Sequence, residues 1–70
     1  MDREQWVETF CRQIGVDPPS PEEVDELLRL AATAAHASER PAAPLACWAA
    51  GRSGIAAAEL QEIAERIAPP

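Results

Sequence analysis

The feature that most constrains this chain is a pair of prolines, Pro41 and Pro44, that follows an alanine-rich segment. Because each proline disfavours helical geometry in the residue before it, a helix that runs through the alanines has to end near this point. A second apolar segment begins at Pro44, so we expect a sharp corner between two helices. His36, Arg40 and Cys47 lie close to this corner in the sequence, which makes it the richest cluster of polar chemistry in the chain.

Helical spacing of apolar residues recurs on both sides of the corner, and no strand-like alternation is present. The pattern predicts helices over about residues 2–14, 21–38, 44–51 and 54–68. We therefore expect one all-α domain over residues 1–70, a compact bundle of three or four helices whose third helix is short. Seventy residues with abundant alanine are close to the lower limit for a self-sufficient core, so a partner or self-association would add stability.

Each predicted helix carries an apolar stripe that we expect to face the core. The first stripe consists of Trp6, Val7, Phe10, Cys11 and Ile14. The second consists of Val24, Leu27, Leu28, Ala31 and Ala35. The third helix has a short apolar face of Leu45, Trp48 and Ala49. The last stripe consists of Ala56, Leu60, Ile63, Ala64 and Ile67.

Local signals mark the ends of these helices. Asp2 is placed to cap the first helix, and Gly15 stands where a left-handed glycine ends it. Ser20 and Glu23 have the spacing of a capping box at the start of the second helix. Ser53 is placed to cap the last helix.

Composition narrows the classes of function and location. The formal charge is −6, and duplex DNA or RNA requires a basic footprint, so we expect no nucleic-acid partner. The charged amino terminus has no apolar segment typical of a secretory signal. The apolar run 45–50 is too short to span a bilayer. We expect a cytoplasmic protein with no membrane partner.

The residue types argue against catalysis and metal binding. The chain has one histidine, no tyrosine, no glycine-rich phosphate loop and no nucleophile elbow. His36 and Cys47 are a conceivable base and nucleophile, but no third residue is placed to orient them. Cys11 and Cys47 have neither disulfide-framework nor metal-ligand spacing. We therefore expect no enzyme activity, no catalytic or metal-binding residue and no cofactor.

The corner is the best candidate for binding, and two interpretations stay open there. Free backbone N–H groups around Ala46 and Cys47, flanked by His36, Arg40 and Arg52, would suit a phosphate or a partner's carboxylate. Alternatively, His36 and Arg40 only complement the negative end of the second helix or bond its last carbonyls.

Trp48 likewise either packs in the core or anchors a partner. The candidate binding residues are His36, Arg40, Cys47, Trp48 and Arg52.

The stretch around the corner resembles a signature of a small all-helical bacterial domain of unknown function. The residues that carry the resemblance are Ala35, His36 and the run Arg40-Pro41-Ala42-Ala43-Pro44-Leu45. The opening is also similar to that family, in Trp6, Cys11 and the run Ile14-Gly15-Val16-Asp17. After Leu45 the chain reads Ala46-Cys47-Trp48-Ala49-Ala50-Gly51, where the family has bulkier aliphatic and hydroxyl residues.

The resemblance implies a role in molybdenum-cofactor metabolism, because that family occurs alone and as an appendage of nucleotidyltransferases that make molybdopterin guanine dinucleotide. The first hypothesis is a non-catalytic accessory module whose corner, residues 36–48, contacts a nucleotidyltransferase or a molybdoenzyme. The alternative is a structural homodimer, closed through alanine-rich faces, that binds no small molecule. A third option is a thiol-based regulator that uses Cys47.

Overall fold

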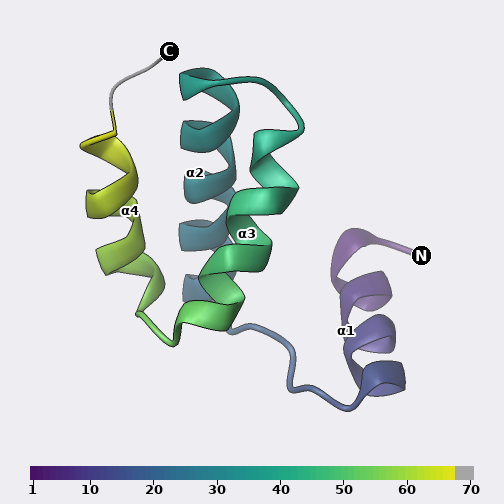
Figure 1. Cartoon of the computed structure of the whole chain (residues 1–70). Coiled ribbons are helices and arrows are strands. Elements are labelled where there is room, and N and C mark those ends of the chain that lie inside the picture. Colours follow the sequence, from purple (N-terminus) through teal and green to yellow (C-terminus); the bar gives the residue numbers. More distant parts are fainter. Residues whose placement is uncertain (68–70) are drawn as a thin grey trace.

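The computed structural model describes residues 1–67 of the chain, and within them it contains helices and no strand (Figure 1). The predicted all-α bundle is confirmed. Residues 1–67 form four helices: α1 (Arg3–Ile14), α2 (Pro21–Ala37), α3 (Ala42–Ser53) and α4 (Ala57–Glu65).

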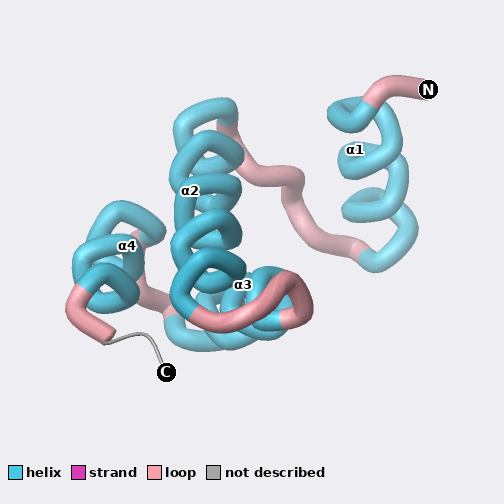
Figure 2. Tube along the Cα trace, turned by 90° about the horizontal axis from the view of Figure 1, so that it is seen from above, coloured by secondary structure: helices cyan, strands magenta, loops and turns pink. Residues whose placement is uncertain are grey.

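The longest helix, α2, organises the fold. The chain runs along α2, reverses at the corner into α3, and reverses again into α4, so the three helices alternate in direction (Figure 1). Both α3 and α4 pack against α2. The α1 helix stands to one side of this three-helix unit in both views, joined to it by residues 15–20 (Figures 1 and 2).

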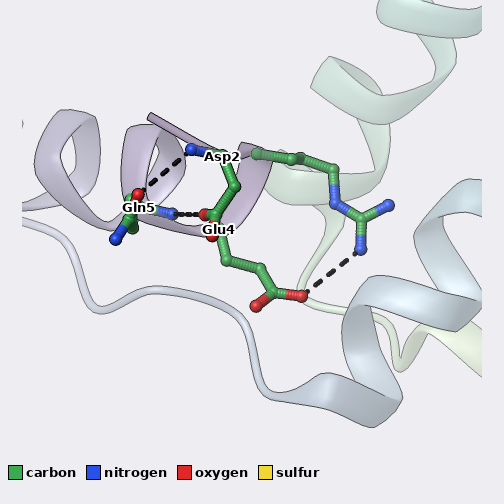
Figure 3. Close-up of polar contacts among 4 residues, drawn as sticks. Asp2, Glu4 and Gln5 are labelled. Atoms are coloured by element: carbon green, nitrogen blue, oxygen red, sulfur yellow. Dashed lines mark hydrogen bonds and ion pairs between the residues drawn. The ribbon is translucent and has the colours of Figure 1, made fainter.

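The amino-terminal end of α1 is fixed by two side-chain hydrogen bonds, of which the sequence predicted the cap by Asp2. The backbone N–H of Gln5 donates to Asp2 Oδ1 at 2.8 Å, and the backbone N–H of Asp2 donates to Gln5 Oε1 at 3.1 Å (Figure 3). Beside this capping box, Arg3 and Glu4 form an exposed ion pair at 3.6 Å (Figure 3). Gly15, with φ of 78°, ends the helix in the left-handed conformation, as predicted.

The start of α2 has the same kind of capping box. The backbone N–H of Glu23 donates to Ser20 Oγ at 3.1 Å, and the backbone N–H of Ser20 donates to Glu23 Oε1 at 2.9 Å. Pro21 takes the first helical position, where its missing N–H costs no hydrogen bond. The predicted capping box is therefore confirmed.

The corner separates α2 from α3, but α3 is longer than predicted. It begins at Ala42 and includes Pro44, because a proline in the first helical turn gives up an N–H that has no intrahelical acceptor anyway. Gly51 lies inside the helix instead of ending it. The helix ends at Gly54, whose φ of 72° an L-residue rarely adopts.

The start of α4 was also predicted wrongly. Ser53 is the last residue of α3: its hydroxyl donates to the carbonyl of Ala50 at 2.8 Å and accepts from the backbone N–H of Ile55 at 3.0 Å. The Ser53 side chain is thus used at the end of α3. The N-cap of α4 is Ala56, which makes no side-chain cap. The helix spans nine residues and is the shortest of the four, and the predicted end at residue 68 lies outside the described residues.

Several residues that the stripes placed in the core are exposed. Leu28 is 49% exposed, whereas Leu30, two positions later and nearly on the opposite side of α2, is 5% exposed. The helix has apolar residues on both sides, and the side that carries Leu30 is the buried one. Ile63 and Ile67 are 40% and 64% exposed.

Candidate protein-interaction surface

His36 and Arg40 lie on either side of the break between the two helices, and both are exposed. His36 is in the last turn of α2, and Arg40 is in the turn that leads into α3. Within residues 1–67, Arg3 and Glu4 form the only ion pair. Within the same residues, the Arg40 guanidinium makes no hydrogen bond to the last carbonyls of α2, so it is available to a partner.

The predicted backbone anion site at the start of α3 is not formed. Because the helix begins at Ala42, Ala46 and Cys47 lie in its second turn, where backbone N–H groups bond to carbonyls four residues earlier. In the first turn, Ala42 donates to the carbonyl of Glu39 at 2.9 Å and Ala43 donates to that of Arg40 at 3.1 Å.

Pro44 has no N–H to offer. The first three positions of α3 therefore leave no free donor for a phosphate, and the predicted cradle around Ala46 and Cys47 is wrong.

The outward side of α3 carries its largest apolar residues. Leu45 and Trp48 are 67% and 66% exposed. The side that packs into the bundle consists of small residues: Ala50 is 8% exposed, and Ala46 and Cys47 are half-buried. This arrangement inverts the usual amphipathic helix, and it places Trp48 on the surface.

The five predicted binding residues divide into two groups. His36 and Arg40 flank the corner, whereas Trp48 and Arg52 lie one turn apart further along α3. The Arg52 guanidinium sits over the Trp48 ring, 5.0 Å from its centroid. At 1.5 Å of rise per residue, Arg52 is about 15 Å along the axis from the first residue of α3. Cys47 is a free thiol on the half-buried side.

Sequence reasoning missed a second exposed apolar surface, on α1. Trp6, Phe10 and Ile14 are 57%, 48% and 57% exposed, although their stripe was assigned to the core. The rings of Trp6 and Phe10 stack, with centroids 5.2 Å apart and planes 19° apart. The only signal in the sequence is the connector, whose Pro18 and Pro19 restrict how the helix can return to the bundle.

Comparison with known proteins identifies a family. A family model described as a domain of unknown function, DUF6457, matches residues 1–69. The chain belongs to the DUF6457 family. No curated protein matches this DUF6457 chain, and no solved structure matches it.

The DUF6457 domain also has an open apolar groove where α1 meets the start of α2. Its apolar lining includes Val7 of α1, Leu27 and Leu28 of α2, and Pro18 and Pro19 of the connector. Arg3, Glu4 and Glu8 stand at this groove as well. The groove shows that only one flank of the α1 stripe is directed toward α2.

Two further findings concern the described part of the DUF6457 domain. Over residues 1–67, no helix combines the length and the apolar character that crossing a bilayer requires. Across the same residues, His, Cys, Asp and Glu side chains form no group of three or more that could hold a metal ion.

Proposed function

We propose that this domain is a cytoplasmic, non-catalytic protein-association module. The observation that carries the proposal is the outward face of α3, where Leu45 and Trp48 are about two-thirds exposed. Among the described residues, the buried hydrophobic ones are only Cys11, Leu30 and Ala50. Large apolar side chains that gather on one exposed helix face are typical of a surface that another protein covers.

The charges around α3 favour a particular kind of partner surface. Residues 40–58 contain two arginines and no acidic residue, in a chain whose formal charge is −6. Arg52 is held over the Trp48 ring, which leaves its N–H groups free to meet a carboxylate at the edge of an aromatic anchor. Arg40 extends this positive character to the corner. We therefore propose an acidic partner surface with an apolar pocket that receives Trp48.

The resemblance of residues 35–45 gives the proposed partner. These residues form the end of α2, the corner and the first turn of α3, so the segment that carries the resemblance adjoins the exposed face. We propose that the domain is an accessory of molybdenum-cofactor metabolism that docks on a molybdopterin guanine dinucleotide nucleotidyltransferase or on a molybdoenzyme. In this role it needs no catalytic residue and no bound cofactor.

The test is a titration of the purified domain with each of those two enzymes from the same organism. We expect Trp48→Ala to weaken binding about tenfold or more, because a buried tryptophan is a frequent hot spot. Arg40→Ala should weaken it less, and Arg29→Ala, an exposed arginine on α2, serves as the matched control. Failure of the unaltered domain to bind either enzyme would refute the proposed partners.

A second candidate function is that of a structural homodimer with no small-molecule ligand. One specific observation favours it. The 7.5 kDa chain exposes 5551 Å² of accessible surface. A compact monomer of this mass exposes roughly 4,200 Å². Light scattering during gel filtration tests it, because a mass that equals one chain at every concentration rules the homodimer out.

A further inference from the structure

Two exposed apolar surfaces of this chain have complementary character. The α1 ridge consists of Trp6, Phe10 and Ile14, and the α3 face consists of Leu45, Trp48 and Arg52. We propose that the α1 ridge of one copy packs on the α3 face of a second copy, and the reverse, in a two-fold dimer. This inference rests on the proposed function, because it takes the α3 face to be an association surface. The second copy covers this face in the free protein, and an enzyme partner that receives Trp48 binds in place of the second copy.

Among residues 1–67, no other helix of the same chain covers either surface. The main helix contacts in the described chain join α2 to α3 and α2 to α4. On α1, Val7 lines the groove toward α2 and Cys11 is buried, but the neighbouring ridge is about half exposed. The connector contains Pro18 and Pro19, whose fixed φ angles hold α1 to the side of the bundle (Figure 2).

The excess of exposed surface is of the size that a dimer needs. The chain exposes 5551 Å², about 1,300 Å² more than a compact monomer of its mass. Its radius of gyration is 12.7 Å, whereas a compact domain of this length has about 11 Å. Specific interfaces bury about 800 Å² on each partner. Covering both surfaces of each chain would remove an area of this order.

The exposed apolar area of the α1 ridge and the α3 face also favours one of the possible pairings. An aromatic residue buries about 150–250 Å², so each surface exposes on the order of 300 Å² of large apolar side chain. Pairing two α1 ridges, or two α3 faces, would bury about 600 Å² in total, which is the range of weak crystal contacts. Pairing α1 with α3 in both directions uses all four surfaces, and the flanking atoms then bring the interface into the range of specific complexes.

Charge favours the same arrangement. Residues 1–17 contain four acidic residues and two arginines, whereas residues 40–58 contain two arginines and no acidic residue. An α1–α1 pair would bring acidic segments together, and an α3–α3 pair would bring two Arg52 side chains together. The reciprocal α1–α3 pair instead sets an acidic segment against a basic one, which lowers repulsion between two copies of a chain that carries −6.

The first experiment measures mass against concentration by sedimentation, with circular dichroism as the check on folding. We expect the full chain to form a dimer of twice 7.5 kDa. Phe10→Ala and Trp48→Ala should each raise the dimer dissociation constant about tenfold or more. Ile67→Ala is the control, because Ile67 is 64% exposed and lies outside both surfaces. A concentration-independent monomer, or a dimer that both variants leave unchanged, would overturn the inference.

The second experiment tests which helices meet. Gln13 flanks the α1 ridge and Ala49 flanks the α3 face, and both residues are exposed. In chains whose two native cysteines are replaced by alanine, a short thiol cross-linker should join Gln13→Cys chains to Ala49→Cys chains in a mixture. Each variant alone should cross-link far less. Efficient cross-linking of either variant alone indicates α1–α1 or α3–α3 pairing and contradicts the inference.

The two proposals can fail separately. A monomer that still binds the nucleotidyltransferase or the molybdoenzyme through Trp48 would refute the dimer and leave the accessory function intact. A dimer with the expected cross-link that binds neither enzyme would support the inference and refute those partners.

Discussion

One polar pair, with Gln61 buried and Thr33 half-buried, joins α4 to α2, and the effect of substituting each residue can be predicted. Gln61 is 7% exposed, and its Nε2 donates to Thr33 Oγ1 at 2.8 Å. Its Oε1 is buried and has no partner among the described residues. Thr33 itself is only half-buried. Removing the Thr33 hydroxyl therefore leaves a buried amide without its partner, whereas removing the Gln61 amide leaves a hydroxyl that water can still reach.

Thr33→Val removes the acceptor and leaves both ends of a buried amide unpaired. A buried polar group without a partner costs about 1–3 kcal/mol, so we expect a loss of this size in the free energy of unfolding. Gln61→Leu has a different effect, because water can reach the half-buried Thr33 hydroxyl and the unpaired Oε1 disappears. We expect Gln61→Leu to be neutral or stabilising by about 1 kcal/mol.

The double variant should resemble Gln61→Leu, because Thr33→Val costs little once the amide is gone. The double-mutant cycle should therefore give a coupling energy of about 1–3 kcal/mol between the two positions. Urea unfolding followed by circular dichroism measures all four proteins, at one fixed chain concentration because self-association raises apparent stability. If Thr33→Val leaves the midpoint unchanged, or Gln61→Leu lowers it as much, the hydrogen bond does not contribute as argued.

Three further predictions concern stability and use the same unfolding assay. Leu30→Ala, at a site 5% exposed, should cost about 2–5 kcal/mol and leave much of the chain unfolded, whereas Leu28→Ala, at a site 49% exposed, should cost under about 1 kcal/mol. Ser20→Ala removes the hydroxyl of the α2 capping box and should lower stability by about 1 kcal/mol. Gly54→Ala should destabilise by about 1–2 kcal/mol because φ is 72°, whereas Gly51→Ala, inside α3 with no atom near the added Cβ, should stabilise by about 0.5–1 kcal/mol.

The sequence predicted the features that depend on hydrogen bonds between near neighbours. The capping of α1 by Asp2 and of α2 by Ser20 involves residues three positions apart, so the pattern contains both partners. Gly15 was recognised because a left-handed residue after an amphipathic helix is most often glycine. These elements need no information from the rest of the fold.

Features that depend on position within a helix were predicted less well. Pro44 indicated a helix start, but a proline fits any position of the first turn, so α3 begins two residues earlier. Gly51 and Gly54 are both possible stop signals, and only Gly54 has a positive φ. Ser53 fits a cap by type, yet its hydroxyl bonds at the end of α3. The type of residue therefore narrows the positions at which a helix can begin or end, but it does not select one of them.

The candidate surfaces could not be predicted because periodicity shows which residues share a side, not which side is covered. In α2, Leu28 and Leu30 are equally apolar and lie on nearly opposite sides. The choice between them depends on where α3 and α4 pack. The same holds for Trp48, whose exposure is decided by the small residues on the other side of its helix.

Because the large apolar residues of α3 face outward and its small residues face the bundle, a substitution in this helix should affect either association or folding, according to its side. Ala50 and the half-buried Cys47 already allow α3 to approach α2 closely, so the bundle gains little from larger residues there. The apolar area of Leu45 and Trp48 adds almost nothing to the stability of a single chain, because it stays in water when the chain folds. Burial of this apolar area contributes stabilising free energy only when another protein surface covers it. Truncating Trp48 should therefore weaken association while the isolated chain unfolds nearly as before, whereas truncating Leu30 should unfold the chain whether or not a partner is present.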